Sequence, residues 1–358
     1  MTDLNHEIIT KKVGRVGHIL LNRERALNAL SLEMVRGIDR ALIDWQNDDE
    51  IEVVVVTGAG DRAFCAGGDV KSVYLAGMAG EVGRDGVLTA DFFREEYTLN
   101  HRIARYPKPY ISYLDGVVMG GGVGISIMGS HRIASENTRF AMPETGIGFF
   151  PDVGGSYFMS RLGPIGLLLA LTGQAINYAD SLNLGIATHF VPRESARDIV
   201  ARIASEGIES ALVDAVEPVA ESETLETLKE LAERCFRVPV FDVILNALRI
   251  ACHDPRLAEV ADQTRDILRT RSPTSLKLTC EQLSRGSQMS FPECLVMEFR
   301  MSQACMQGHD FYEGIRALLI DKDHSPKWSP GSLEAVDEEL VLSHFENLDD
   351  RELRLGFS

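Results

Sequence analysis

A valine-rich run, Ile51–Thr57, is the feature that most constrains the fold of this 358-residue chain. A run of this composition is typical of a strand buried on both faces, because successive valines leave neither face polar. Strand and helix patterns alternate around it. We expect a hairpin over His6–Leu21, a helix from an N-cap at Ser31 through Trp45, a helix over Asp91–Ala104 and a strand over Tyr110–Leu114. This alternation indicates an α/β fold.

The second half of the chain is predicted to be mostly helical from about residue 160 onward. A boundary near residue 195 would divide the chain into a core, 1–195, and a helical C-terminal region, 196–358. The acidic stretch Glu334–Glu352 is predicted to be a solvated helical face. Four long amphipathic stretches support the helical prediction: 196–206, 223–236, 241–252 and 256–270.

Composition excludes several classes of protein. The net charge of -17 argues against nucleic acid as a partner, because phosphate binding needs a surplus of Lys and Arg. The six cysteines form no CxxC pair and no zinc-like spacing, so we expect reduced thiols and no metal. No apolar run is long enough to cross a membrane. The polar N-terminal segment Met1–Lys12 resembles neither a signal nor a transit peptide, which favours the cytoplasm; a mature form from the mitochondrial matrix would look similar.

Two local motifs suggest other chemistry and are set aside. Gly58–Ala63 fits the dinucleotide pattern GxGxxG/A, but that pattern needs a helix to open at its second glycine, and the paired glycines Gly67 and Gly68 follow instead. Gly124–Met128 begins like a nucleophile elbow but lacks the final glycine, so Ser126 is predicted to be a helix residue.

Three segments carry the candidate chemistry: 63–69, 116–124 and 140–155. The first two are glycine-rich and follow predicted strands. Such turns expose backbone N–H groups without a side chain in the way, and two of them can form an oxyanion hole. The alternative is that these glycines only permit tight turns or close helix packing, and for either segment alone that interpretation is favoured.

The third segment holds two acids, each directly after a proline. Glu144 follows Pro143 and Asp152 follows Pro151, among Phe, Met, Ile and Gly residues. Apolar surroundings raise the pKa of a carboxyl group toward the range useful for acid–base catalysis. The alternative is helix capping, which suits Asp152 in particular, because glycines follow it closely.

Together these segments resemble the enoyl-CoA hydratase/isomerase (crotonase) superfamily, and within it the branch that hydrolyses CoA thioesters. The resemblance extends from about Asn22 to Trp328. It implies a spiral core of repeated ββα units, followed here by the helical C-terminal region. The resembling segments are 92–97, 119–124, 140–145, 150–155, 185–190, 272–277, 302–305, 308–311, 313–316 and 321–328.

The resemblance also implies roles for individual residues. The backbone N–H groups of Gly68 and Gly121 would form the oxyanion hole for a thioester carbonyl. Glu144 would be the catalytic carboxylate, Asp152 its catalytic partner, and Glu96 a substrate contact. The segment 22–28 resembles the adenine-side binding loop of the family, and Arg25, Lys71 and Lys322 are candidate contacts of the CoA phosphates.

The choice of reaction rests on one missing side chain. Hydration in this family uses two glutamates, and the position of the first corresponds here to Gly124. Losing one acid–base group costs about 10²–10⁴-fold in rate. Thioester hydrolysis needs an oxyanion hole and one activating group, because a thiolate leaves readily. The sequence therefore predicts thioester hydrolysis, with Glu144 acting as nucleophile or as general base. The resemblance implies a short-chain 3-hydroxyacyl-CoA as the substrate and valine breakdown as the pathway.

Other functions stay open at this stage. An enoyl-CoA hydratase or isomerase of the same fold is one, because some isomerases of the superfamily carry an acid at the position of Asp152. A CoA-ester-binding protein without catalysis is another. No cofactor is expected beyond the CoA of the substrate. Relatives often form trimers or hexamers, so a homo-oligomer is expected as well.

Overall fold

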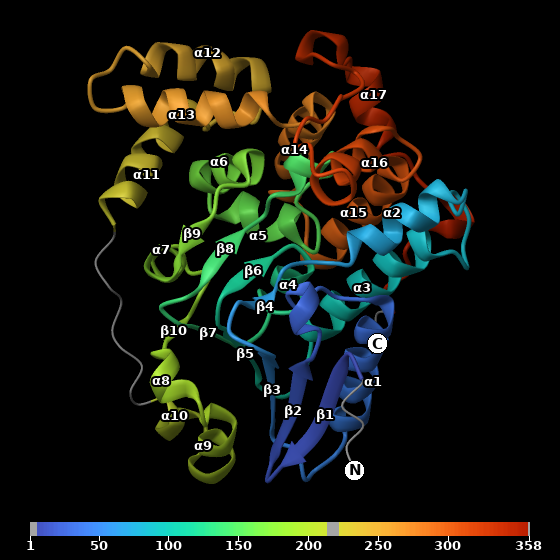
Figure 1. Ribbon diagram of the computed structural model, residues 1–358, viewed down its shortest axis with the longest axis vertical. Coiled ribbons are helices and arrows are strands. Elements are labelled where there is room, and N and C mark those ends of the chain that lie inside the picture. The colour runs from blue at the N-terminus through green and yellow to red at the C-terminus, as the bar shows by residue number, and fades with distance from the viewer. Residues whose placement is uncertain (1–5, 213–221, 357–358) are drawn as a thin grey trace. The chain divides into compact units, whose positions relative to one another are not determined.

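The computed structural model describes residues 6–212 and 222–356 (Figure 1). Contacts divide the chain into two compact units, and each unit is assembled from three separate stretches. The first unit comprises 1–69, 98–141 and 175–221, and the second comprises 70–97, 142–174 and 222–358. Residue 195 lies inside the first unit, so the division by contacts differs from the predicted boundary between 1–195 and 196–358.

The first unit contains a six-stranded sheet of order β1-β2-β3-β5-β7-β10. The predicted hairpin is confirmed as the antiparallel pair of β1 and β2, and every other neighbouring pair is parallel. The strands are β1 Ile8–Val13, β2 Val16–Leu21, β3 Val53–Gly58, β5 Tyr110–Leu114, β7 His131–Ala134 and β10 His189–Phe190.

A second, four-stranded sheet of the same unit has the order β4-β6-β8-β9. The chain alternates between the sheets: β3, β5 and β7 join the larger sheet, and β4, β6 and β8 follow each of them in the smaller one. This repeat confirms the expected ββα spiral. The short strands are β4 Ala63–Cys65, β6 Val117–Met119, β8 Arg139–Ala141 and β9 Ile176–Asn177, and the sequence patterns had indicated only β8 among them.

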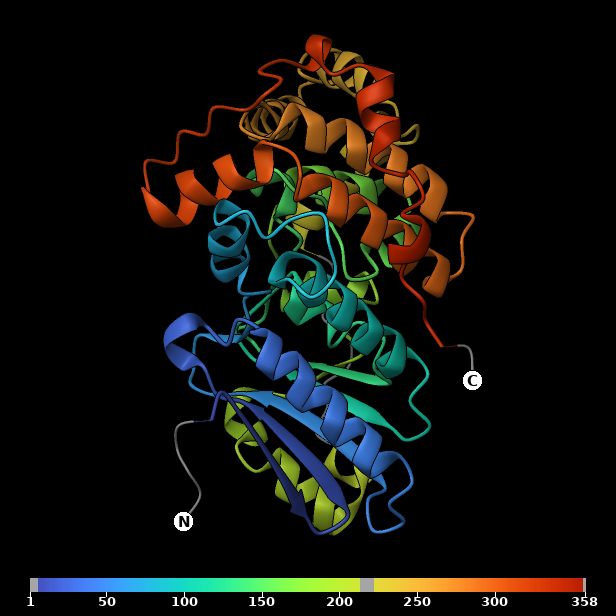
Figure 2. The ribbon, with the colours of Figure 1, turned by 90° about the vertical axis from the view of Figure 1, so that its right-hand side faces the viewer.

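Burial on both faces of β3 is confirmed. Val53 and Val55 belong to an apolar cluster with Ile199 and Ile203 of α9. Val54 and Val56, which point to the opposite face, are fully buried as well. Helix α1 packs against β1 and β2, and Figure 2 shows it running beside these strands.

The remaining helices of the first unit are short. Ser31 caps α1 as predicted, since its hydroxyl accepts a hydrogen bond from Met34 N at 3.2 Å. Helix α4 after Gly120 is only one turn, and Ser126 lies in the turn that follows it, so the prediction that Ser126 is a helix residue is wrong. The helices are η1 Glu24–Ala26, α1 Leu32–Gln46, α4 Gly121–Gly124, α7 Tyr178–Asn183, α8 Arg193–Ala196, α9 Ile199–Glu206 and α10 Ile208–Ala211.

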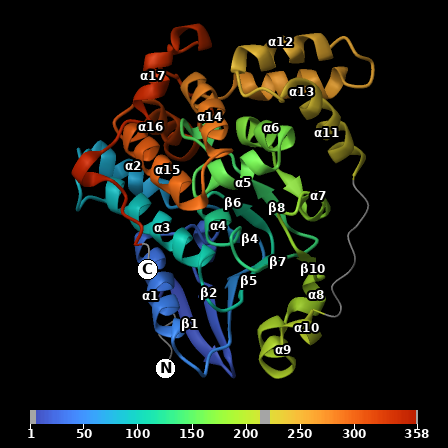
Figure 3. The ribbon, with the colours of Figure 1, turned by 180° about the vertical axis from the view of Figure 1, so that it is seen from behind.

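The described part of the second unit consists of helices and loops. Helix α3, Leu88–Ala104, begins in this unit and ends in the first. Helices α12 and α13 lie side by side (Figures 1 and 3). The other helices are α2 Val70–Met78, η2 Glu144–Ile147, α5 Gly155–Arg161, α6 Pro164–Thr172, α11 Glu223–Cys235, α12 Phe241–Ala251, α13 Ala258–Arg269, α14 Pro273–Gly286, α15 Phe291–Cys305, α16 Asp310–Ile315, η3 Arg316–Ile320, η4 Leu333–Ala335, α17 Glu338–Ser343 and η5 Asp349–Arg351.

The helical predictions for the C-terminal region hold in part. The stretches 223–236, 241–252 and 256–270 correspond to α11, α12 and α13. The stretch 196–206 is broken before α9. The acidic end is not one solvated helical face, because it forms three short helices and buries Val341 and Phe345. Within the described ranges, no helix combines the length and apolarity that a membrane span requires.

Asn28 joins two loops of the first unit. Its side-chain amide donates to Ala59 O and to Ala63 O, both at 2.9 Å, and its oxygen accepts from Arg23 N at 3.0 Å. The side chain is fully buried, and its φ of 56° is one that Asn tolerates better than most residues. The adenine-side loop is thereby tied to the chain that leads into β4.

We predict that Asn28→Ala lowers the free energy of unfolding by about 2–4 kcal/mol, because one buried and two partly buried polar groups lose their partner. Urea unfolding followed by circular dichroism measures this. Asn22→Ala is the control, since Asn22 makes a more exposed hydrogen bond to His6 O. Equal losses in the two variants would contradict the role given to Asn28.

Candidate active site

The two glycine turns lie next to each other in the first unit. Strands β4 and β6 are parallel neighbours, so their carboxyl ends meet at one edge of the small sheet. A Cβ atom added to Gly67 would lie 3.8 Å from the amide nitrogen of Gly121. A Cβ atom on Gly122 would lie 2.3 Å from Cys65 O, a distance that no side chain can adopt. Glycine is therefore required where the two turns pack together.

The amides of these turns are available to a ligand. Leu30 N donates to Gly67 O and Asp69 N donates to Leu30 O, both at 2.8 Å. The amide of Gly68, between these two positions, takes no part in either hydrogen bond. Gly121 is the first residue of α4, where an amide has no acceptor within its own helix. In residues 6–212 and 222–356, neither amide has a backbone acceptor outside the regular elements. Two such donors can bind a carbonyl oxygen that gains negative charge.

The candidate phosphate contacts are dispersed. Arg25 and Lys71 are exposed residues of the chain before α1 and of α2, and Lys322 is exposed after η3. Arg23 is committed to structure, since its guanidinium donates to Ala29 O at 2.7 Å and to Asp69 Oδ2 at 3.0 Å. A phosphate role for Arg25, Lys71 and Lys322 stays a prediction.

Three acids of the second unit interact with one another. Glu96 lies on α3, Glu144 is the first residue of η2, and Asp152 lies in the loop before α5. Their relative exposures are 2%, 6% and 6%. Asp152 does not cap a helix: the N-cap of α5 is Gly154, and the Asp152 carboxylate accepts from Tyr97 Oη at 2.8 Å.

Burial dominates the electrostatics of the three acids. Loss of hydration raises the pKa of Glu96 and of Glu144 well above the ordinary value, and the charge of Asp152 adds to both increases. Burial also raises the pKa of Asp152 to about 7, against the opposing effect of its hydrogen bond from Tyr97. Among the described residues no basic side chain contributes to these shifts. The pKa values of all three carboxyl groups therefore lie above those of exposed acids, in the direction that acid–base catalysis near neutral pH requires.

Two of the carboxylate oxygens face no protein partner. Within the described ranges, Glu96 Oε1 and Glu144 Oε2 are buried without a hydrogen bond. A buried polar atom without a hydrogen bond destabilises the fold, and its presence at a site is consistent with an atom that gains its hydrogen bond when a ligand binds. These two oxygens are thus the atoms of the cluster most suited to contact substrate or water.

Aromatic side chains of the same unit pack against one another and contribute to its buried interior. Phe149 stacks on Phe150 with ring centroids 4.4 Å apart and on Phe93 at 5.4 Å. Phe93 in turn contacts Tyr97, and Phe149 contacts Phe311. Sequence reasoning missed Tyr97, although it directly follows Glu96 within a segment that carries the family resemblance.

The motifs set aside at the sequence level form no site. No helix opens at Gly60, and β4 follows instead. Ser126 Oγ donates to Gly122 O at 2.8 Å, in the manner of a helical hydroxyl rather than a nucleophile.

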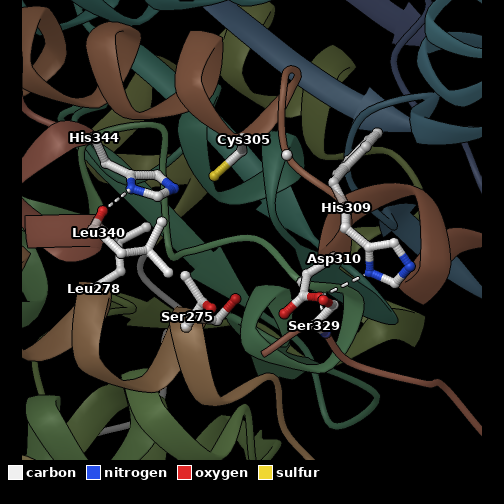
Figure 4. A pocket seen from close by; sticks show the side chains of 12 residues that line it. Ser275, Leu278, Cys305, His309, Asp310, Ser329, Leu340 and His344 are labelled. Atoms are coloured by element: carbon white, nitrogen blue, oxygen red, sulfur yellow. Dashed lines mark hydrogen bonds and ion pairs between the residues drawn. The ribbon is translucent and has the colours of Figure 1, made fainter. Parts of the chain in front are cut away.

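A separate cavity of about 70 Å³ in the second unit brings together Cys305, His309, Asp310 and His344 (Figure 4). Its polar groups serve structure: Asp310 accepts from Ser272 Oγ at 2.6 Å and lies 3.1 Å from His309 Nδ1. Burial raises the pKa of the Cys305 thiol, and in the described ranges no hydrogen bond joins its Sγ to either imidazole. The thiol is therefore not activated as a nucleophile.

The fold defines a class of protein. The chain belongs to the enoyl-CoA hydratase/isomerase family, whose model matches residues 16–345. Among curated proteins it is similar to the mitochondrial 3-hydroxyisobutyryl-CoA hydrolases of Danio rerio and Homo sapiens. The identities are 45% and 42%, over 98% and 99% of this chain and 92% of each relative.

Two solved structures share the fold. One is a carnitinyl-CoA dehydratase from Mycobacterium thermoresistibile, with a TM-score of 0.91 and 39% identity over 99% of this chain and 100% of that one. The other is an enoyl-CoA hydratase from Rhodobacter sphaeroides 2.4.1, with a TM-score of 0.88 and 38% identity over 98% and 100%. The crotonase-like fold expected from the sequence is confirmed.

The raised pKa of Asp152 predicts a pH-dependent stability effect. Between its ordinary pKa of 3.8 and its folded pKa of about 7, the folded state retains a proton that the unfolded state releases. The stability that this carboxyl contributes is complete below the lower value and is lost as the pH rises through the higher one.

We therefore expect Asp152→Asn to be more stable relative to the parent at pH 8 than at pH 5, by on the order of a few kcal/mol. Melting temperatures of both proteins at the two pH values measure this. Asp266→Asn, at an exposed ion pair with Arg269, controls for general charge effects. A pH-independent difference between parent and Asp152→Asn would refute the assignment.

Proposed function

We propose that this chain hydrolyses the thioester bond of 3-hydroxyisobutyryl-CoA, releasing 3-hydroxyisobutyrate and CoA in valine breakdown. The observation that carries the proposal is the buried cluster of Glu96, Glu144 and Asp152, without a second glutamate at the position of Gly124. The curated relatives described above, 42–45% identical over nearly the whole chain, carry the name of this activity.

In the proposed mechanism, the amides of Gly68 and Gly121 bind the thioester oxygen. They stabilise the negative charge that develops when the carbonyl carbon becomes tetrahedral. No side chain is needed to stabilise this negative charge, because both donors belong to the backbone. The proposal requires that these donors and Glu144 act on the same thioester.

Glu144 supplies the chemistry in one of two ways. As a general base, it takes a proton from water while the water oxygen attacks the carbonyl carbon, and the proton passes to the departing CoA thiolate. As a nucleophile, it forms a mixed anhydride and releases the thiolate, and water then cleaves the anhydride. In both routes Asp152 orients the water or the substrate hydroxyl, and Glu96 contacts the substrate.

Proton transfer without hydrolysis is the second candidate function. Glu144 interacts electrostatically with Asp152, which comes from another loop, and a pair of this kind can also move a proton in dehydration or isomerisation. The two similar solved structures are those of a dehydratase and a hydratase. Release of free thiol distinguishes the candidates, since only hydrolysis produces it.

A CoA-ester-binding protein without catalysis is disfavoured by the cost of the cluster. Three buried acids that perform no chemistry would destabilise the fold without any functional benefit. We propose that catalysis needs no cofactor beyond the CoA carried by the substrate. A homo-oligomer stays a prediction, as does the cytoplasm or the mitochondrial matrix as the compartment.

We expect Glu144→Gln to reduce the rate of CoA release from 3-hydroxyisobutyryl-CoA by about 10²–10⁴-fold, because the amide can neither accept a proton nor attack the carbonyl. A thiol reagent follows the rate, and calorimetry with the same ester measures binding. Binding should stay within about tenfold of the parent, since the amide has nearly the same shape. Glu233→Gln, at an exposed position of α11, is the matched control. Near-normal turnover in Glu144→Gln would contradict the role of Glu144.

Hydroxylamine added during turnover separates the two routes. A mixed anhydride on Glu144 would be trapped as a protein hydroxamate, which mass spectrometry locates on the peptide that contains residue 144. Turnover without any hydroxamate would count against the nucleophilic route and favour the general base.

A further inference from the structure

A fourth buried acid, Glu298 of α15, contacts the segment that follows Asp152. Its side chain is fully buried, and it has no part in the mechanism proposed above. Glu298 Oε2 accepts from Gly154 N at 2.7 Å, and Oε1 accepts from Ser156 N at 2.9 Å. The short distances are typical of charge-assisted hydrogen bonds.

The loop that Glu298 holds has an unusual backbone. Val153 and Gly154 are consecutive residues with φ of 53° and 90°. A β-branched residue rarely adopts a positive φ, and such a conformation persists only where the surroundings enforce it. A Cβ atom on Gly154 would lie 2.4 Å from the Phe291 ring, so the loop also has no room to change.

A second anchor holds the other end of the same loop. Gln282 Nε2 of α14 donates to Pro151 O at 2.6 Å and to Ser156 Oγ at 2.9 Å. Gln282 and Glu298 are both fully buried. Asp152 therefore lies between two fixed points, and its carboxylate is directed by the hydrogen bond from Tyr97.

The position of Glu298 requires a carboxylate in particular. Two backbone N–H groups face it, one for each oxygen, and a carboxyl group can place one oxygen against each of them. A glutamine would set its NH₂ group against one of the two N–H donors. An aspartate would keep both acceptors but is one methylene shorter, so it could not reach both donors without moving the loop.

From this geometry we propose that Glu298 is a positioning residue for Asp152, which fixes the backbone of Gly154 and Ser156 and so sets the place of the Asp152 carboxyl. The inference rests on the proposed function, because it assumes that Asp152 takes part in turnover. Sequence reasoning missed Glu298, although an acid in the apolar face formed by Cys294, Met301 and Cys305 of α15 is a detectable signal.

The electrostatic coupling supports this inference. Burial raises the pKa of Glu298 to about 8, the hydrogen bonds from Ser156 and Gly154 oppose the increase, and the charge of Asp152 adds to it. Because such coupling is mutual, a charge at Glu298 also disfavours ionisation of Asp152. The titratable groups that interact with Asp152 are Glu96 and Tyr97 of α3, Glu144 of η2, and Glu298 and Cys305 of α15.

Two substitutions test the geometry at Glu298. Glu298→Gln replaces one of the two acceptors with a donor, whereas Glu298→Asp keeps both acceptors and shortens the reach. We expect kcat for CoA release to fall about 10- to 100-fold in both, with KM changed by less than about threefold, because the backbone that carries a reacting group is displaced. A fall in kcat without a rise in KM distinguishes a displaced reacting group from lost substrate binding.

Glu352→Gln is the matched control. It removes a largely buried carboxylate of the same unit that also contacts α15, through Arg300 Nε at 2.9 Å, but does not touch residues 151–156. A loss of kcat equal to that of this control would overturn the proposal. If Glu298→Gln fails to fold by circular dichroism, Glu298→Asp decides, and an unchanged kcat in it rejects the role of Glu298.

The parent protein keeps the two proposals apart. If it releases no thiol from 3-hydroxyisobutyryl-CoA, the proposed function fails before any variant is compared. If the parent is active and Glu298→Asp equals it in kcat, only the inference about Glu298 fails.

Discussion

Carboxyl groups buried without a cation are the constraint on which the second unit depends. Among the described residues, no Lys or Arg contributes to the pKa shifts of Glu96, Glu144 and Asp152, so hydration is lost without an ionic interaction to offset it. The chain accommodates these acids by raised pKa values and by the hydrogen bond from Tyr97 to Asp152. The same features that make the cluster costly make its protons available near neutral pH.

In the first unit, the candidate site consists of backbone amides and hardly any side chains. Its glycine turns follow β4 and β6, strands of only three residues each, and the parallel pairing of these strands brings the turns to one edge. Backbone amides placed in this way do not reorganise when charge develops on a bound oxygen. The close approach at Gly122 shows why neither turn accepts a larger residue.

Chemistry on this fold is decided by which side chains surround a common backbone site. Proteins of one family can carry different activities, because the fold positions the donors and leaves the acids to vary. In this chain the resemblance places Gly124 where hydration uses one of its two acids, and Asp152 lies on a separate loop. The hydrogen bonds of Glu298 and Gln282 show that this loop is held as firmly as a regular element, even though Val153 has a strained conformation there.

The amino-acid sequence by itself determined the strands with strong apolar patterns, the helix capped by Ser31 and the family, because these signals are local or are carried by short motifs. It also singled out Glu144 and Asp152, since acids after proline in apolar segments are conspicuous. Only the tertiary structure disclosed β4, β6 and β9, whose two or three residues are too short to show a period. Only the structure, likewise, showed that Asp152 accepts from Tyr97 instead of capping a helix, and that Glu298 holds its loop from 146 residues away along the chain. Hydrogen bonds between distant segments leave no periodic trace in a sequence, because they depend on where the folded backbone brings donors and acceptors together.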